Sequence, residues 1–186
     1  MIKKILLGFG ILILIVGAYV GYVLLTTKNH SPAAVAEYKD SDFLIQVNYS
    51  QPYKKGRLIF GTEAERALVP YGKKWRTGAN EATEISFSHD VIIEGVPLKA
   101  GRYSLYTIPE GTFWTVAFNS KLGYWGKGFS DVFDESKDVL RVPALVENGL
   151  PEIEQFTISF APYDSLVNMN FYWADTRATL AIKRAQ

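Results

Sequence analysis

The sequence predicts an all-β domain, a single antiparallel β-sandwich with Greek-key or jelly-roll connections, preceded by one N-terminal transmembrane helix. Apolar residues recur at every second position through most of the chain, which is typical of half-buried strands. Glycine, proline and aspartate separate these runs, as the turns of a sandwich require. One long run of mostly apolar residues near the N-terminus contains no charged residue. The 186 residues have room for one ordinary domain and an appendage.

Residues 1–28 are predicted to form a membrane anchor with a short cytoplasmic tip. The run from Ile5 to Leu25 has no charged residue, and a helix of that length spans roughly 30 Å, the thickness of one hydrocarbon core. A cleaved signal peptide is the alternative, but its apolar region is usually about 7–15 residues long. Lys3 and Lys4 favour a cytoplasmic N-terminus. We therefore expect a single pass through the inner membrane and a periplasmic C-terminal domain.

Three glycines of this helix, Gly10, Gly17 and Gly21, fall near one stripe. Small residues with this spacing let a second helix approach closely, so the stripe is a candidate helix-packing face. Glycines are also common in single spans that pack against nothing, and both interpretations stay open.

Residues 29–42 read as a tether, with room for a helical turn at 33–38, and residues 43–186 as the sandwich. Beyond the anchor, no long segment has a helical period, although one or two turns fit residues 62–67. The clearest alternation of apolar and polar residues runs through 43–49, 85–87, 114–118, 156–160, 167–173 and 178–182. Shorter runs at 58–60, 91–93, 103–108 and 139–146 bring the expected number of strands to about ten.

The composition excludes several classes of protein. With 48% hydrophobic residues, 14% aromatic residues and a formal charge of +1, the chain is neither disordered nor an evident polyanion binder, and no nucleic-acid partner is expected. Cysteine is absent, which removes disulfides, thiolate metal sites and a thiol nucleophile.

Several segments resemble the bacterial envelope family called domain of unknown function 2911, found mainly in Bacteroidetes. These segments are "VNYSQPYKKGRLIFG", "LVPYGKKWRTGANEATEISF", "AGRYSLYTIP", "WTVAFN", "DVLRV" and "FTISF". The likeness extends from about Val47 to the C-terminus, and the block from Val69 to Thr83 is its most specific part. It implies a secreted or membrane-tethered all-β protein and supplies no activity or catalytic residue. The membrane anchor and a small insertion at 62–67 depart from the family pattern.

The stretch "WRTGANEAT", residues 75–83, is the first candidate site, because binding residues often lie on loops that lead into a sheet. Arg76 could clamp a carboxylate, a phosphate or a sugar hydroxyl. Asn80 could supply a donor and an acceptor, and Glu81 could orient a ligand or accept a proton. Trp75 or Tyr71 could provide a stacking wall.

The same stretch can also be a turn that needs no ligand. Gly78 would then adopt a left-handed conformation, and Asn80 would bond to neighbouring backbone. Arg76 would pair with Glu81 or Glu84, and the tryptophan before it would enter the core.

A second candidate is the glycine-rich segment 121–133, where Tyr124 and Trp125 could stack on a sugar ring or a partner peptide. Alternatively, Trp125 and Phe129 plug one end of the sandwich. The acidic residues that follow, from Asp131 to Asp138, lack the spacing of an EF-hand. We predict no metal site and no cofactor, and a solvated acidic loop instead.

No catalytic motif is complete. His89 and Asp90 lie beside two serines, but neighbours on one strand point to alternate faces and do not form a triad. The sequence therefore predicts a membrane-anchored binding or interaction domain for a small ligand, a glycan or another envelope protein. The alternatives are an enzyme that uses Glu81 as acid or base with Arg76 as anion stabiliser, and a structural subunit of a membrane complex.

Overall fold

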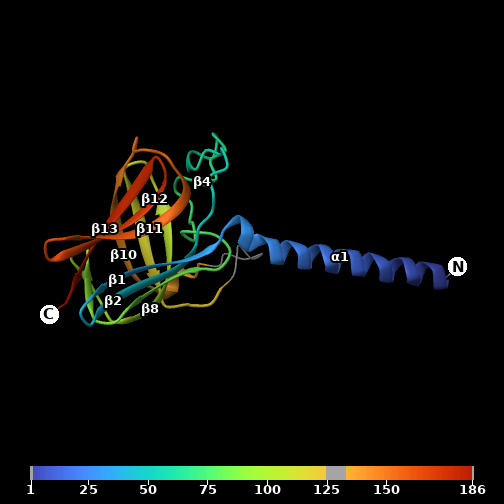
Figure 1. Cartoon of the computed structure of the whole chain (residues 1–186), viewed down its shortest axis with the longest axis horizontal. Coiled ribbons are helices and arrows are strands. Elements are labelled where there is room, and N and C mark those ends of the chain that lie inside the picture. Colours follow the sequence, from blue (N-terminus) through green and yellow to red (C-terminus); the bar gives the residue numbers. More distant parts are fainter. Residues whose placement is uncertain (1, 125–132, 186) are drawn as a thin grey trace.

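The computed structural model describes residues 2–124 and 133–185, without the side chains of residues 2–7, 23–25, 27 and 28. One long helix, α1 (Ile2–His30), extends away from a body of strands (Figure 1). The longer strands are β1 (Ala33–Asp40), β2 (Phe43–Ser50), β5 (Thr83–Phe87), β8 (Gly101–Pro109), β9 (Phe113–Asn119), β10 (Asp138–Glu147), β11 (Ile153–Tyr163), β12 (Leu166–Ala174) and β13 (Thr176–Arg184). The short elements are β3 (Phe60–Gly61), β4 (Val69–Pro70), β6 (Val91–Ile93), β7 (Val96–Leu98) and the 3-10 helix η1 (Glu135–Lys137).

The strands form one antiparallel sheet that curls until it nearly closes into a barrel (Figure 1). Its order is β1-β2-β5-β8-β9-β10-β13-β12-β11, with β6 added beside β13 and β7 beside β6. At the closing seam, the amide of Phe156 donates to the carbonyl of Pro52 at 3.0 Å, and the amide of Lys54 donates to Glu154 at 2.7 Å. Strands β3 and β4 form a separate parallel pair.

The all-β prediction is confirmed, and the two-sheet arrangement predicted with it is replaced by this continuous sheet. Strand β10 is the reason, because it pairs with β9 along most of its length and with β13 at its end. Leu145 has a partner on each side, Phe113 in β9 and Thr179 in β13. Alternation of apolar and polar residues marks an inner and an outer face, but it does not show how many sheets share the core.

The helical turn predicted at 33–38 is wrong. These residues belong to β1, which pairs with β2 over its full length from Ala33–Ser50 to Asp40–Phe43. Only Ala36 of β1 is buried, so the strand lacks the apolar alternation that identified the others.

The core fills the barrel. Inward residues of β2 such as Ile45 and Val47 are fully buried, and their neighbours in sequence face outward, as the predicted alternation requires. At one end of the barrel, Trp75 packs against Phe156 with ring centroids 4.9 Å apart and stacks on Trp173 at 5.8 Å and 20°. This aromatic cluster forms the base of the site described below.

The described apolar side chains of helix α1 are largely exposed. Its residues 11–16 are all apolar, and each is between 50% and 73% exposed, so every face of the helix is uncovered. A Cβ added at Gly10, Gly17 or Gly21 would meet no atom within 4 Å, so nothing described here packs on the predicted glycine stripe. Within the described residues, no helix is long and apolar enough to cross a membrane. The span predicted for residues 5–25 is thus not confirmed and stays a prediction.

Candidate functional site

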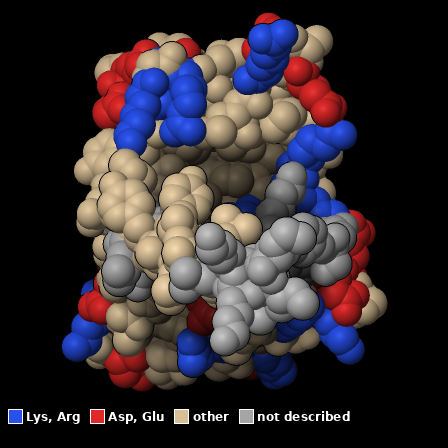
Figure 2. All heavy atoms as spheres, turned by 90° about the vertical axis from the view of Figure 1, so that its right-hand side faces the viewer, with Lys and Arg blue, Asp and Glu red and all other residues tan. Residues whose placement is uncertain are grey.

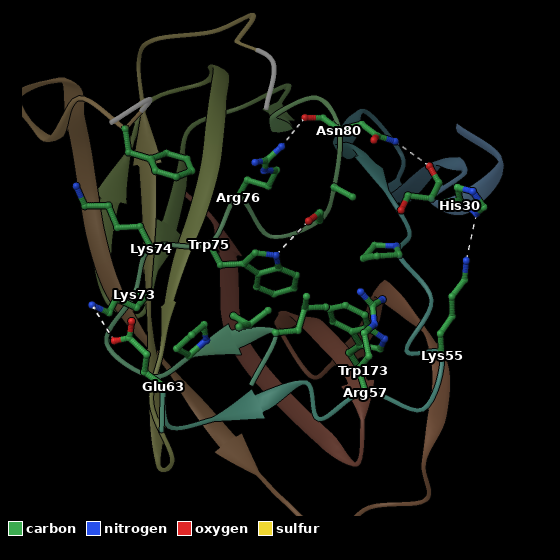
Figure 3. A pocket seen from close by; sticks show the side chains of 18 residues that line it. His30, Lys55, Arg57, Glu63, Lys73, Lys74, Trp75, Arg76, Asn80 and Trp173 are labelled. Atoms are coloured by element: carbon green, nitrogen blue, oxygen red, sulfur yellow. Dashed lines mark hydrogen bonds and ion pairs between the residues drawn. The ribbon is translucent and has the colours of Figure 1, made fainter. Parts of the chain in front are cut away.

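A pocket of about 650 Å³ opens at the end of the barrel from which α1 departs (Figure 3). Four segments form most of its lining: the end of α1 with Ser31, residues 52–57, residues 68–74, and the predicted loop at residues 75–80. Its basic lining residues are His30, Lys55, Arg57, Lys73, Lys74 and Arg76, against one acidic lining residue, Glu63. The tryptophan pair Trp75 and Trp173 lies at its base. Lys73 pairs with Glu63 at 3.4 Å, and the described lining keeps an excess of basic over acidic residues.

Hydrogen bonds to Thr107 of β8 and to Thr83 of β5 hold the loop at residues 75–80 in place. Trp75 and Thr107 exchange both backbone hydrogen bonds, at 2.7 and 2.8 Å, and the hydroxyls of Thr77 and Thr107 lie 3.1 Å apart. The Thr83 hydroxyl donates to the Thr77 carbonyl at 2.8 Å. Gly78 has a φ of +153°, and its carbonyl accepts a 3.1 Å hydrogen bond from the Trp75 indole. The loop is therefore a turn fixed by hydrogen bonds, and one of its faces lines the pocket.

Arg76 has no carboxylate partner among the described residues. It is half-buried, and its Nη1 donates to the carbonyl of Asn80 at 2.8 Å. Burial lowers the pKa of Arg76, because desolvation disfavours its charged form. The predicted pairing with Glu81 or Glu84 is wrong for Glu84, which instead pairs with Arg102 at 2.6 Å. A partly desolvated guanidinium that contacts only a carbonyl retains donors for an anion.

Asn80 lines the pocket, and its side chain holds the loop in place. Its Nδ2 donates to the carbonyl of Ser31 at 3.1 Å, and the residue is 8% exposed. The bond joins the loop to the chain just beyond α1, instead of to neighbouring backbone as the structural interpretation expected.

The other predicted site residues lie elsewhere. Glu81 and Tyr124 line a second depression of about 580 Å³ beside β1 and β2. The Tyr124 hydroxyl donates to Ser104 at 3.1 Å. Tyr71 packs partly buried against the core and does not line either pocket. Trp125 lies outside the described residues. The structure thus brings Trp75, Arg76 and Asn80 to one pocket and places Glu81, Tyr124 and Tyr71 outside its lining.

Comparison with known proteins identifies the domain. A model of the family described as "protein of unknown function (DUF2911)" matches residues 31–182. The chain belongs to this family. No curated protein and no solved structure matches it. The DUF2911 region includes every pocket-lining residue except His30, the last residue of α1.

Sequence reasoning missed the basic residues that face Arg76 across the pocket, Lys55 and Arg57. Both lie in the quoted family segment "YKKGR", and a cluster of basic residues in a family block was the signal that could have identified them. Lys55 Nζ lies 3.1 Å from the Nδ1 atom of His30. Arg57 donates to the backbone carbonyls of Tyr53 and Lys54.

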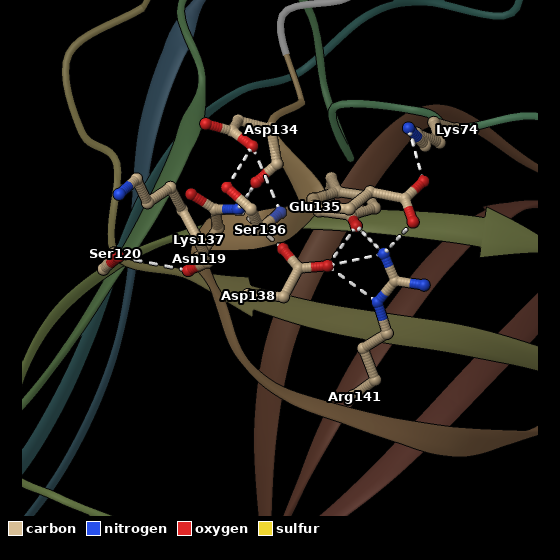
Figure 4. Close-up of polar contacts among 10 residues, drawn as sticks. Lys74, Asn119, Ser120, Asp134, Glu135, Ser136, Lys137, Asp138 and Arg141 are labelled. Atoms are coloured by element: carbon tan, nitrogen blue, oxygen red, sulfur yellow. Dashed lines mark hydrogen bonds and ion pairs between the residues drawn. The ribbon is translucent and has the colours of Figure 1, made fainter.

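The acidic segment of the DUF2911 domain is anchored, not simply solvated as predicted (Figure 4). Asp138 accepts from the Tyr106 hydroxyl at 2.6 Å and pairs with Arg141 at 2.6 Å. Glu135 pairs with Arg141 at 2.8 Å and with Lys74, a pocket residue, at 2.6 Å. No group of three or more metal-ligating side chains occurs among the described residues. These carboxylates pair with basic side chains, and the pair of Glu135 with Lys74 joins this segment to the wall of the pocket.

Proposed function

We propose that this DUF2911 domain is a binding domain that takes an anionic ligand in the pocket at the mouth of the barrel. The observation that carries the proposal is the half-buried Arg76 guanidinium, for which no described carboxylate provides a counter-charge. Burial of a charge without a partner is unfavourable, so the domain gains stability when a ligand supplies the anion. Lys55 and Arg57 strengthen the argument, because the described partners of their side chains are backbone carbonyls or an imidazole ring and include no carboxylate.

The chemistry of the pocket favours a ligand with a carboxylate or phosphate group and an apolar portion. A guanidinium donates two parallel hydrogen bonds to either anion. Leu68, Val69 and Pro70 line the same cavity and provide apolar contact for the remainder of the ligand. A volume of about 650 Å³ lies within the usual range of roughly 300–1,000 Å³ for small-molecule sites.

The proposal includes a membrane location with a periplasmic domain. Two observations support it: the uncharged run from Ile5 to Leu25, and the exposed apolar side chains on all faces of α1. Apolar surface costs roughly 25 cal/mol for each Å² left in water, which favours placing this helix in an apolar environment. We expect the full chain to stay with the membrane fraction after alkaline carbonate extraction, and its release into the supernatant would contradict the proposal.

The enzyme alternative receives less support. Arg76 lines the first pocket and Glu81 lines the second, so the proposed acid or base and the proposed anion stabiliser do not share one described cavity. The role of a structural subunit, held in a membrane complex through the glycine stripe, stays a prediction. A glycan or an envelope protein as the ligand of the binding domain also stays a prediction.

The binding proposal is tested by thermal unfolding of the full chain in an uncharged detergent. Phosphate and carboxylate compounds would be added to wild type, Arg76→Ala and Arg184→Ala. A ligand at 100 times its dissociation constant adds about 2.7 kcal/mol to stability, which a melting curve detects. Arg184 pairs with Asp42 near the C-terminus, at the opposite end of the barrel from α1 (Figure 1), and is the matched control.

We expect at least one anion to raise the melting temperature of wild type and Arg184→Ala, and to raise that of Arg76→Ala much less. The proposal fails if no anion stabilises wild type. It also fails if Arg76→Ala, still folded, responds as strongly as wild type.

A further inference from the structure

We propose that the anion bound in this pocket is the phosphate headgroup of an anionic lipid, taken from the bilayer surface beside α1. This inference rests on the proposed function and adds to it the class and the source of the ligand.

The position of the pocket is the first argument. His30, the last residue of α1, and Ser31, which follows it, both line the cavity. The mouth of the pocket therefore lies at the base of the helix whose apolar side chains are exposed (Figures 1 and 3). With α1 in a bilayer, the pocket would open next to the layer of lipid headgroups.

The arrangement of charge is the second argument. Arg76 stands on one side of the cavity, and Lys55 and Arg57 stand on the side nearest the end of α1 (Figure 3). The phosphate monoester of a phosphatidate has three unesterified oxygens and can accept hydrogen bonds from cations on both sides of the cavity at once, whereas a carboxylate has two oxygens in one plane. Basic residues beside a membrane helix are also attracted to anionic headgroups.

The third argument is apolar surface beside these cations. Leu58 and Leu68 are 49% and 42% exposed, and their backbones are joined by a 2.9 Å hydrogen bond from the Leu68 amide to the Leu58 carbonyl. Leu58 directly follows Arg57, and Leu68 lines the pocket. Large apolar side chains interspersed with basic ones are typical of surfaces that enter the boundary between headgroups and acyl chains.

Figure 2 views the molecule from the side of α1, and the basic side chains in view lie mainly at the margin of this face, together with acidic ones. A lipid in the pocket would place its phosphate among Arg76, Arg57 and Lys55. Its glycerol and acyl portion would leave past Leu68 toward the bilayer.

Native mass spectrometry of the full chain in an uncharged detergent tests the inference. Dioctanoyl phosphatidate is titrated against dioctanoyl phosphatidylcholine, sn-glycerol 3-phosphate and inorganic phosphate. Wild type is compared with Arg76→Ala, with Arg57→Gln and with Arg184→Ala as the control. Arg57 is exposed, so its substitution is expected to leave the fold intact, which circular dichroism checks for every variant.

We expect one phosphatidate per chain, bound about tenfold or more tightly than phosphatidylcholine and than sn-glycerol 3-phosphate. Arg76→Ala and Arg57→Gln are each expected to weaken phosphatidate binding about tenfold, which corresponds to about 1.4 kcal/mol. Arg184→Ala is expected to bind as wild type does.

The contrary outcomes separate this inference from the proposed function. If sn-glycerol 3-phosphate or inorganic phosphate binds as tightly as phosphatidate, the lipid source is wrong while the anion pocket stands. Equal binding of phosphatidylcholine also overturns the lipid inference. The lipid inference is wrong if no phosphate compound binds. It is also wrong if neither Arg76→Ala nor Arg57→Gln weakens phosphatidate binding. A negative result in the thermal unfolding of wild type with all anions would then remove the proposed function as well.

Discussion

At the scale of single residues, the loop of residues 75–80 combines a strained turn with a binding surface. Thr77 has a φ of 57° although it is β-branched, and its side chain is fully buried. Such a conformation costs about 1–3 kcal/mol and persists only where surrounding contacts impose it, which the hydrogen bonds to Thr107 and Thr83 do. The turn therefore holds Arg76 in place before a ligand arrives, so that little ordering is needed on binding.

Gly78 is the residue on which this turn depends most. A Cβ added there would lie 2.9 Å from the carbonyl oxygen of Ser50, and its φ of +153° disfavours any side chain. We expect Gly78→Ala to lower the free energy of unfolding by at least about 2 kcal/mol, measured by urea denaturation.

Gly95→Ala provides the matched control for this substitution. Gly95 also has a positive φ, +80°, but a Cβ there meets no atom within 4 Å. The decrease in unfolding free energy caused by Gly95→Ala should therefore reflect backbone strain alone, about 1 kcal/mol. A loss in Gly78→Ala no larger than that in Gly95→Ala would contradict the proposed close approach to Ser50.

At the scale of elements, η1 and the start of β10 are held to the barrel by charge. Glu135 of η1 contacts both Lys74 and Arg141, and Arg141 also donates to the Tyr106 hydroxyl at 2.8 Å. Burial raises the pKa of Tyr106, and the hydrogen bond to Asp138 raises it further, so the phenol stays protonated and continues to donate. This network connects the pocket wall to the outer surface of β8 and β10.

The network predicts a measurable dependence on pH. Hydrogen bonds from Lys74 and then Arg141 hold the pKa of Glu135 below its usual value of 4.5. A carboxylate with a lowered pKa contributes stability above its unfolded-state pKa and loses it as the pH falls through the folded-state value. Between pH 6 and 3, the free energy of unfolding should therefore decrease more in wild type than in Glu135→Gln.

Urea denaturation at each pH provides this comparison. Other carboxyls with a lowered pKa, such as those of Asp42 and Asp90, are present in both proteins and cancel in the difference. Parallel curves for wild type and Glu135→Gln would show that the Glu135 contacts do not stabilise the fold.

At the scale of the whole molecule, one side chain supports the seam that nearly closes the barrel. The hydroxyl of Tyr49 in β2 accepts a 3.0 Å hydrogen bond from the Ile158 amide in β11, 109 positions along the chain. It also accepts from the Gln51 side chain at 3.0 Å. Tyr49 is 6% exposed, so removal of its oxygen would leave a buried amide without this partner.

Tyr49→Phe is accordingly expected to cost about 1–3 kcal/mol of unfolding free energy, the usual penalty for an unsatisfied buried donor. Tyr103→Phe is the matched control, because the Tyr103 hydroxyl donates to Lys99 at an exposed position. We expect a change within about 0.5 kcal/mol for the control. Equal effects in the two variants would mean that the Tyr49 hydrogen bonds do not secure the seam.

The positions of most strands could be read from the chain alone, because alternation along a strand is a local property. Strands β2, β5, β9, β12 and β13 lie where the apolar alternation predicted them. Strand β1 was missed because it is an edge strand with one buried residue, Ala36. The loop at 75–80 was also identified from its residues, which are chemically unusual for a turn.

Only the tertiary structure shows how these strands pair and which loops come together at the pocket. Whether the strands form two sheets or one depends on β10, whose two partners are distant in sequence. The pocket depends on the seam, because the bonds between residues 52–54 and β11 bring Lys55 and Arg57 opposite Arg76. Glu81 is near Arg76 in sequence yet lines a different depression. Sequence patterns report which face of an element is buried, whereas a site is formed by contacts between elements, and those depend on long-range pairing.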